Sequence, residues 1–306
     1  MRIPRNLLSY DGGVAKINVN GKFNFVNNNG KLLSEQWFDD GDYFNEGFAA
    51  VLLNDKWNFI GKDGELLSKE WFDCCNNFHE GLARVTLNGK WNYIGKNGKV
   101  LSEQWFDDCD NFNEGLAKVR LNDKFNFIDE DGKLLSKKWF ENCLSFCDGF
   151  AAVRLNKMYN FIDKYGKLLS ERWFEYGFNF SEGFCVVELN NEWNYIDTNG
   201  NILSDQWFDY CGLFSEGFGV VSLNNKWNFI GKDGKFLSEQ WFDDCYGFHE
   251  GFAVVKVNNK WNFIDKNTNI LSKQWFNHCW SFKEGFATVR ANDMFYKIDK
   301  NGKLLK

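Results

Sequence analysis

Two rows of carboxylates recur along the chain at intervals of 34 residues, and carboxylates are common general acids and bases. The first row is Asp39, Asp73, Asp107, Glu141, Glu175, Asp209 and Asp243, with Asn277 at its end. The second row is Glu46, Glu80, Glu114, Asp148, Glu182, Glu216, Glu250 and Glu284. An active site needs one convergent pocket rather than eight equal copies of a residue. We therefore expect structural roles such as hydrogen bonding in turns, and we predict that the protein is not an enzyme.

Histidines and cysteines are the other candidates, as metal ligands or nucleophiles. His79, His249 and His278 stand in different repeats. Six of the nine cysteines share one row, which indicates a small packing position: Cys75, Cys109, Cys143, Cys211, Cys245 and Cys279. No pair has the Cys-x-x-Cys spacing of a zinc site, and no phosphate loop or dinucleotide motif is present. We predict no catalytic residue, no metal and no cofactor.

The overall composition narrows the class of partner. The net charge is −6, from 36 basic and 42 acidic residues, which disfavours a surface that tracks nucleic-acid phosphates. No apolar run approaches the roughly 20 residues of a membrane span, and no signal peptide is recognised. Together with free cysteines, this predicts a cytoplasmic protein.

A 34-residue repeat must position all of these residues. Its opening glycine falls at Gly13, Gly47, Gly81, Gly115, Gly149, Gly183, Gly217, Gly251 and Gly285. We predict an N-terminal cap over residues 1–12 and a single array of nine units over residues 13–306, with the last unit truncated.

The period of the apolar residues predicts strands rather than the helical hairpins that share this repeat length. After each opening glycine, small residues and Val or Leu alternate with variable ones, as in Ala49, Val51 and Leu53. An Asn-Gly or Asn-Asp pair then indicates a tight hairpin turn, as at Asn54. A second strand, Lys56–Ile60, and a short apolar strand, Leu66–Ser68, follow. For the rest of the unit, a fourth strand and an irregular corner with one helical turn both remain open, and its regular Trp and Phe rows are typical of a stacked core.

At these residues the chain resembles the WG repeat proteins of bacteria. The match is clear at Glu80–Ala83, Lys90–Trp91, Tyr93–Ile94 and Asn97–Gly98, and it extends over about residues 13–306. The glycine that follows Trp in that family is Asn here, as at Asn58, which suggests a backbone with positive φ and an amide that bonds from repeat to repeat. The resemblance implies a structural and interaction repeat without catalytic residues.

Two architectures suit such units: an open β-solenoid or superhelix, and a closed β-propeller. A propeller usually closes by sharing one blade between the termini. Here both ends carry the same element, Leu7-Leu8 and Leu304-Leu305, so they duplicate rather than complement each other. We favour the open all-β array.

Variable rows are free to carry specificity, because the constant rows hold the fold together. In the second half of the array these rows become aromatic, and rings on a rigid frame are typical of interfaces and sugar sites. The predicted partner-binding residues are Tyr176, Phe178, Tyr210, Tyr246, His278 and Trp280. We predict a non-catalytic scaffold that binds a protein or peptide; the alternative is a module that binds surface glycans or cell wall.

Overall fold

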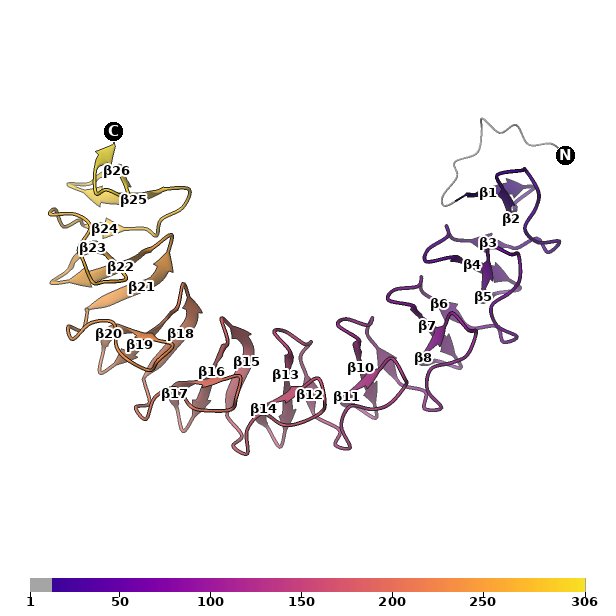
Figure 1. The fold of residues 1–306 in the computed structure, drawn as a ribbon, viewed down its shortest axis with the longest axis horizontal. Helices are drawn as coiled ribbons and strands as arrows, with labels where there is room; N and C mark the ends of the chain where they lie inside the picture. The colour runs from indigo at the N-terminus through magenta and orange to yellow at the C-terminus, as the bar shows by residue number, and fades with distance from the viewer. Residues whose placement is uncertain (1–12, 306) are drawn as a thin grey trace. The chain divides into compact units, whose positions relative to one another are not determined.

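The structure of the protein, a computed structural model, describes residues 13–305 apart from the side chain of Phe178. The predicted cap over residues 1–12 lies outside the described residues, as does Lys306. Every regular element in the described part is a strand, and no helix there could cross a membrane (Figure 1). The chain divides into two compact units, Met1–Cys143 and Leu144–Lys306, here called the N-terminal and C-terminal units.

Over residues 13–143, the N-terminal unit contains one two-stranded sheet, three three-stranded sheets and one further short strand. Its strands are β1 (Val14–Val19) and β2 (Lys22–Asn27); β3 (Asp40–Gly41), β4 (Phe48–Leu53) and β5 (Lys56–Gly61); β6 (Cys74–Cys75), β7 (Leu82–Leu87) and β8 (Lys90–Gly95); β9 (Asp108–Cys109), β10 (Leu116–Leu121) and β11 (Lys124–Asp129); and β12 (Asn142–Cys143).

The C-terminal unit repeats the same plan, with β13 and β14 paired at its start and a four-stranded sheet at its end. Its strands are β13 (Phe150–Leu155) and β14 (Met158–Asp163); β15 (Tyr176–Ser181), β16 (Phe184–Leu189) and β17 (Glu192–Asp197); β18 (Tyr210–Ser215), β19 (Phe218–Leu223) and β20 (Lys226–Gly231); β21 (Asp244–His249), β22 (Phe252–Val257) and β23 (Lys260–Asp265); and β24 (His278–Cys279), β25 (Phe286–Ala291), β26 (Met294–Asp299) and β27 (Leu304–Leu305).

Tight turns between the central and third strands of each sheet follow directly from the sequence. Asn54 and Asp55 both have positive φ, 51° and 61°, which is the conformation of a type I′ hairpin turn. This turn sets the register of β4 against β5, in which Leu53 pairs with Lys56. The predicted hairpin is therefore confirmed.

The segment that follows Ile60, for which the sequence left two forms open, is an irregular connection with bends at Leu67, Lys69 and Glu70 and without a helical turn. Trp57 pairs with Phe72, and Ile60 pairs with Leu66, through isolated bridges. The chain then forms the first strand of the next sheet. That strand has two residues in β3, β6, β9, β12 and β24, but six residues in β15, β18 and β21.

Consecutive sheets within a unit stack face to face, so the core lies between sheets. One cluster joins Phe59, from the third strand β5, to Val85 and Ile94 of the following sheet. The Phe row that includes Phe72 and Phe106 is fully buried, as expected for a stacked core. Because both faces of a sheet are covered, residues of the variable face such as Ala50 are buried as well.

The Asn row corrects one expectation from the sequence. Asn58 is not among the residues with positive φ, and its buried side-chain amide bonds within its own repeat. Its Nδ2 donates to the carbonyls of Ser68 at 2.8 Å and Glu70 at 3.2 Å, while its Oδ1 accepts from the N–H of Phe59 at 2.8 Å. The amide fits here because the following loop turns back across the third strand and presents its carbonyls to that side chain.

A glycine turn makes one of the direct contacts between neighbouring repeats. Gly64 has a φ of +87°, and a Cβ placed on it would lie 1.8 Å from the carbonyl oxygen of Leu33 in the preceding repeat. Gly98 stands in the same relation to Leu67. Only glycine fits this approach without displacing backbone.

Strand pairing is local throughout the described residues. The sheet nearest the start combines β1 and β2, and the sheet nearest the end combines β24 to β27. The propeller that we considered would place strands from both ends of the chain in one sheet. The predicted all-β repeat array is confirmed, with the sheet pairing of an open array.

Candidate binding strip

The predicted partner-binding residues share one kind of position, at or just after the first strand of a sheet in the C-terminal unit. Tyr176 begins β15, Tyr210 begins β18, Tyr246 lies in β21, and His278 begins β24, with Trp280 just beyond it. Phe178 lies in β15, and its side chain is outside the described part of the structure. We call Tyr176, Tyr210, Tyr246, His278 and Trp280 the aromatic strip.

Each tyrosine of the strip rests against a tryptophan of a third strand. The ring centroids of Tyr176 and Trp193 are 5.1 Å apart at 66°, and those of Tyr210 and Trp227 are 5.5 Å apart at 59°. Tyr246 stacks on Trp261 at 5.4 Å and 14°. These edge-to-face and stacked pairs hold the exposed rings in fixed orientations.

The strand register explains the pairs of Tyr176 and Tyr210, whose tryptophan members the sequence analysis did not identify. Tyr176 of β15 is opposite Glu188 of β16, which is itself opposite Trp193 of β17. All three side chains therefore project from one face of the sheet. The signal that could have found Trp193 is its spacing of 17 residues after Tyr176, which recurs from Tyr210 to Trp227.

A cluster of rings forms the other end of the strip. The ring of His278 lies 5.1 Å from that of Trp261 and 4.3 Å from that of Trp280. Trp280 also lies 5.9 Å from Phe295. Burial, reinforced by the nearby Arg290, lowers the pKa of His278, so the imidazole is neutral at pH 7 and packs as an aromatic ring.

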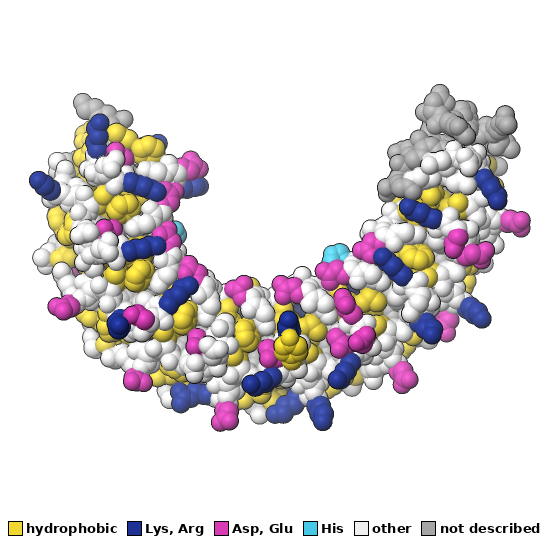
Figure 2. All heavy atoms as spheres, in the orientation of Figure 1, with side chains coloured by type: hydrophobic (Ala, Val, Ile, Leu, Met, Phe, Trp, Pro, Cys, Tyr) yellow, Lys and Arg dark blue, Asp and Glu magenta, His cyan; other side chains and the backbone are white. Residues whose placement is uncertain are grey.

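The strip is open to solvent although it rests on the core. Tyr210 is 47% exposed, Tyr246 41% and Trp280 42%. Leu213 beside Tyr210 is 65% exposed. On the face shown in Figure 2, each unit carries charged side chains of both signs mixed with hydrophobic ones.

The same rows are charged or polar in the N-terminal unit. Lys118 forms an ion pair with Asp110 at 3.1 Å, and Arg120 approaches Asp108 at 3.9 Å. In these ion pairs, opposite charges of the same surface neutralise each other. Exposed rings at these rows are thus a feature of the C-terminal unit.

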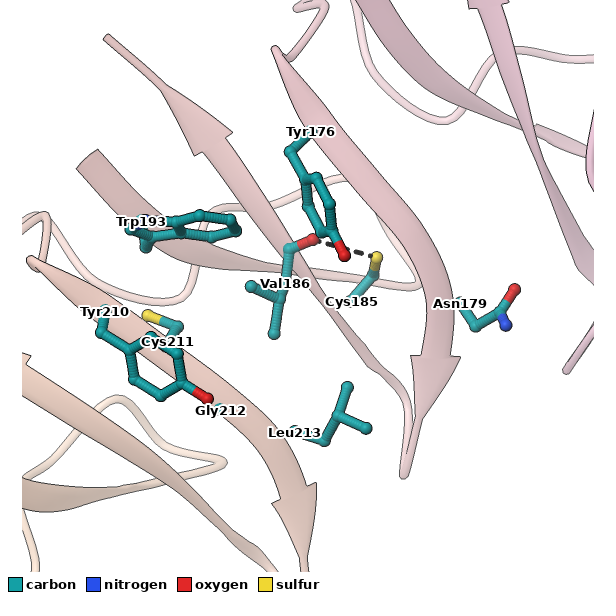
Figure 3. Close-up of a pocket in the computed structure, with 9 residues that line it drawn as sticks. All are labelled: Tyr176, Asn179, Cys185, Val186, Trp193, Tyr210, Cys211, Gly212 and Leu213. Atoms are coloured by element: carbon teal, nitrogen blue, oxygen red, sulfur yellow. Dashed lines mark hydrogen bonds between the residues drawn. The ribbon is translucent and has the colours of Figure 1, made fainter. Parts of the chain in front are cut away.

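A pocket of about 370 Å³ opens between β15, β16 and β17 on one side and β18 on the other (Figure 3). It brings together two of the predicted residues, Tyr176 and Tyr210. Its full lining is Tyr176, Asn179, Cys185, Val186, Trp193, Tyr210, Cys211, Gly212 and Leu213. Tyr246, His278 and Trp280 are not part of it.

The carboxylate rows hold turns in place. Asp73 accepts a hydrogen bond from the backbone N–H of Asn88 at 2.6 Å and one from Lys56, and the Lys56 bond holds the pKa of Asp73 below its usual range. Glu46 of the second row accepts from the N–H of Gly81 in the next repeat at 3.0 Å and pairs with Lys96 at 2.9 Å. The bonds of Asp73 hold the hairpin turn at Asn88, and those of Glu46 join two consecutive repeats.

The cysteine row lies in the core. Cys109, Cys143, Cys211, Cys245 and Cys279 are buried and Cys75 is partly buried, and all are free thiols. Burial raises the pKa of the Cys109 thiol to about 12, so it stays protonated and unreactive at neutral pH. Within the described part of the chain, His, Cys, Asp and Glu side chains form no group of three that could hold a metal ion.

Several solved structures show distant overall similarity. The eukaryotic initiation factor structure is 10% identical, with 97% of this chain and 96% of that chain covered and a TM-score of 0.39. Kluyveromyces lactis Hsv2p is 7% identical, with coverages of 74% and 92% and a TM-score of 0.30. The extracellular domain of the putative one component system BT4673 from B. thetaiotaomicron is 10% identical, with coverages of 96% and 58% and a TM-score of 0.30.

No curated protein matches the sequence. The pattern of the WG containing repeat matches seven successive segments, at residues 25–57, 59–91, 93–125, 127–159, 161–193, 195–227 and 229–261. These segments span well over half of the chain and follow the 34-residue period of its sheets. The chain therefore belongs to the WG containing repeat family.

Proposed function

We propose that this protein is a non-catalytic interaction scaffold whose C-terminal unit binds a protein or peptide through the aromatic strip. A WG-repeat chain of stacked β-units is a repeat domain of the binding or scaffold kind. The observation that carries the proposal is the set of exposed rings, Tyr210, Tyr246 and Trp280, each supported by packed neighbours.

Such rings suit binding for energetic reasons. A Tyr or Trp side chain offers a large contact area and loses little conformational entropy when it is covered. The entropy cost here is lower still, since Trp227 and Trp261 already orient the rings of Tyr210 and Tyr246. The few residues whose truncation costs about 2 kcal/mol or more of binding free energy are enriched in Trp and Tyr and lie at the desolvated centre of an interface.

The surroundings of the carboxylates support a non-catalytic role. Asp73 and Glu46 are each held by a lysine and a backbone N–H, so their oxygens are already engaged in the fold.

The free and mostly buried cysteines support a reducing compartment, and we propose the cytoplasm.

Glycan binding is the second candidate, favoured by the same exposed rings, since sugars stack on aromatic faces. The two candidates differ in the ligand that the strip captures. A glycan array and a pull-down from cell lysate, run with the same purified protein, separate them. A strip-dependent signal from the array alone would contradict the protein-binding proposal.

The strip is tested with a triple variant, Tyr176→Ser, Tyr246→Ser and Trp280→Ser. Its matched control is Tyr43→Ser with Tyr165→Ser, because both of these tyrosines are exposed and lie off the strip. We expect the strip variant to lose at least tenfold in affinity for a captured partner, while the control binds as the wild type does. Equal binding by folded strip and control variants would reject the strip as the interface.

A further inference from the structure

Some repeats of the N-terminal unit cover a third-strand ring with a cation of their own. The guanidinium carbon of Arg84 in β7 lies 5.2 Å from the ring centroid of Trp91 in β8. Its Nη1 donates to the carbonyl oxygen of Cys109, in β9 of the next sheet, at 2.6 Å. The Arg84 side chain thus bridges the gap between two consecutive sheets and contacts the face of an aromatic ring.

Lysine at the same row makes the same bridge elsewhere. The Nζ atom of Lys16 lies 4.3 Å from the ring centroid of Phe23 and donates to the carbonyl of Gly41 in the next sheet. The position thus accepts either kind of cation. In both cases the residues are spaced identically: the ring follows the cation by seven residues, and the carbonyl follows it by 25.

The equivalent residues around the sheet β15–β16–β17 are Val186 at the position of the cation, Trp193 at that of the ring, and Cys211 of the next sheet at that of the carbonyl. Valine is too short to reach the next sheet. All three residues line the 370 Å³ pocket, in which the short Val186 side chain lies with the rings of Tyr176, Trp193 and Tyr210 around it (Figure 3). The pocket therefore occupies the place that the Arg84 side chain fills in the N-terminal unit.

The charges around the pocket favour a cation from outside. None of its nine lining residues is charged. Glu188 lies between Tyr176 and Trp193 in strand register. Burial raises the pKa of Tyr176, and the negative charge of Glu188 adds to this shift. At the row of Glu188, other repeats carry cations, including Arg120, Arg154, Lys256 and Arg290. Valine also stands at the position of the internal cation in two later repeats, at Val220 and Val254, but Glu188 is the only carboxylate in its row.

We propose that this pocket receives an arginine side chain of the protein or peptide partner. The guanidinium takes the place of the Arg84 group, over the ring of Trp193 and within reach of the Cys211 carbonyl, with Glu188 at the rim. Arginine fits better than lysine because its planar guanidinium stacks on rings and carries several N–H donors. The inference rests on the proposed function, because it assigns a ligand to one part of the strip.

The test uses the full-length protein and the tripeptide Ac-Gly-Arg-Gly-NH2, with the citrulline tripeptide as its uncharged isostere. Binding is followed by NMR at the indole N–H of Trp193. We expect saturable shifts with the arginine peptide and at least tenfold weaker binding of the citrulline peptide. Equal binding of the two peptides would overturn the proposal.

Two variants block the pocket in different ways. Val186→Arg supplies the cation internally, as Arg84 does. Gly212→Leu fills the pocket from β18, where an added Cβ meets its nearest neighbours at 3.4–3.7 Å, an ordinary contact distance. Both should weaken binding of the arginine peptide at least tenfold, and Glu188→Gln should weaken it about two- to fivefold.

Gly247→Leu is the matched control, because an added Cβ there meets only Val220, at 3.9 Å, and Gly247 does not line the pocket. It should bind the arginine peptide as the wild type does. If Val186→Arg fails to fold by circular dichroism, Gly212→Leu decides the question. Unchanged binding by a folded blocking variant would overturn the proposal.

The two proposals can fail separately. If the triple strip variant loses its protein partner while Val186→Arg keeps it at full affinity, the arginine inference is wrong and the interaction scaffold stands. If the arginine peptide binds the wild-type pocket but the strip variant still captures the partner, the strip is not the interface.

Discussion

Single residues that look reactive in the sequence serve turns and junctions in the fold. Asp39, for example, accepts hydrogen bonds from Lys22 and from the backbone N–H of Asn54, and so ties the hairpin turn at Asn54 to β2 of the preceding sheet. The Lys22 bond lowers the pKa of Asp39, which keeps the carboxylate ionised as a hydrogen-bond acceptor. The repetition of Asp39 in later units reflects the repetition of this turn.

Thr268 breaks the repeat pattern at a turn between two strands. It has a φ of 66° at the turn where other repeats carry a glycine, such as Gly234 with a φ of 77°. A β-branched side chain in this left-handed region is strained. We predict that Thr268→Gly raises the free energy of unfolding by about 1 kcal/mol, as measured by urea denaturation.

The opposite change at an equivalent turn supplies the control. Gly98→Ala would place a Cβ 2.1 Å from the carbonyl oxygen of Leu67. It should lower the free energy of unfolding by more than about 2 kcal/mol, because backbone must move to relieve the clash. A Thr268→Gly variant no more stable than the wild type would show that the turn at Thr268 has relaxed without cost.

At the scale of elements, a longer first strand distinguishes three sheets of the C-terminal unit. β15, β18 and β21 have six residues each, whereas β3, β6 and β9 have two. The longer strands replace Asp and Asn with aromatic residues, which favour extended chain. Each longer strand also contains a register shift, as between Gly177 and Phe180. Three residues of the aromatic strip, Tyr176, Tyr210 and Tyr246, therefore lie on these longer strands.

Junctions between repeats depend on ion pairs that acid should break. Glu250 accepts from the N–H of Gly285 at 2.9 Å and pairs with Lys300 at 3.0 Å, and Glu46 pairs with Lys96 in the same way. The hydrogen bonds from these lysines lower the pKa of both glutamates below the ordinary value of 4.5. Their stabilisation is present above pH 4.5 and is lost as the pH falls through the lowered values.

We predict that Tm falls steeply below about pH 4.5 and that Glu250→Gln reduces this fall. Thermal melts followed by circular dichroism between pH 7 and pH 3 measure the effect. Glu239→Gln, which changes an exposed glutamate, should melt like the wild type across the range. If Tm falls equally with pH in Glu250→Gln and in the wild type, the ion pair of Glu250 does not cause the loss of stability in acid.

At the scale of the whole molecule, each repeat is stabilised mainly by its neighbours, because its core is shared between consecutive sheets. Val85 is fully buried in a cluster that joins residues of two sheets. Stability in such an array is close to a sum over repeats and their junctions. A local defect should therefore have a local effect.

We predict that Val85→Ala costs about 2 kcal/mol, and that this cost is not spread evenly along the chain. Hydrogen exchange of the full-length protein should show the greatest loss of protection in β7 and β8 and in the sheets on either side of them. Loss should be smaller in the C-terminal unit. Equal loss in all sheets would show that the protein unfolds as one cooperative body.

Local chemistry made much of this fold predictable. Alternation such as Ala49 and Val51 identified the strands, and the Asn54 turn identified the hairpin, because both depend on neighbouring residues. The family followed from the same repeated pattern. The side-chain amide of Asn58 was assigned the wrong partners, because its acceptors lie ten and twelve residues further along a loop whose path no local rule specifies.

What the sequence determined by itself is the repeat, its strands and turns, and the rows where variation concentrates. Only the tertiary structure decided which rows meet. The pairing of Tyr176 with Trp193 depends on strand register. The gap between Val186 and Cys211 depends on the stacking of one sheet against the next, and the equivalent gap in the N-terminal unit is filled by Arg84. The physical reason is that strand and turn preferences act over a few residues, whereas these contacts join residues 17 and 25 positions apart through packing in three dimensions.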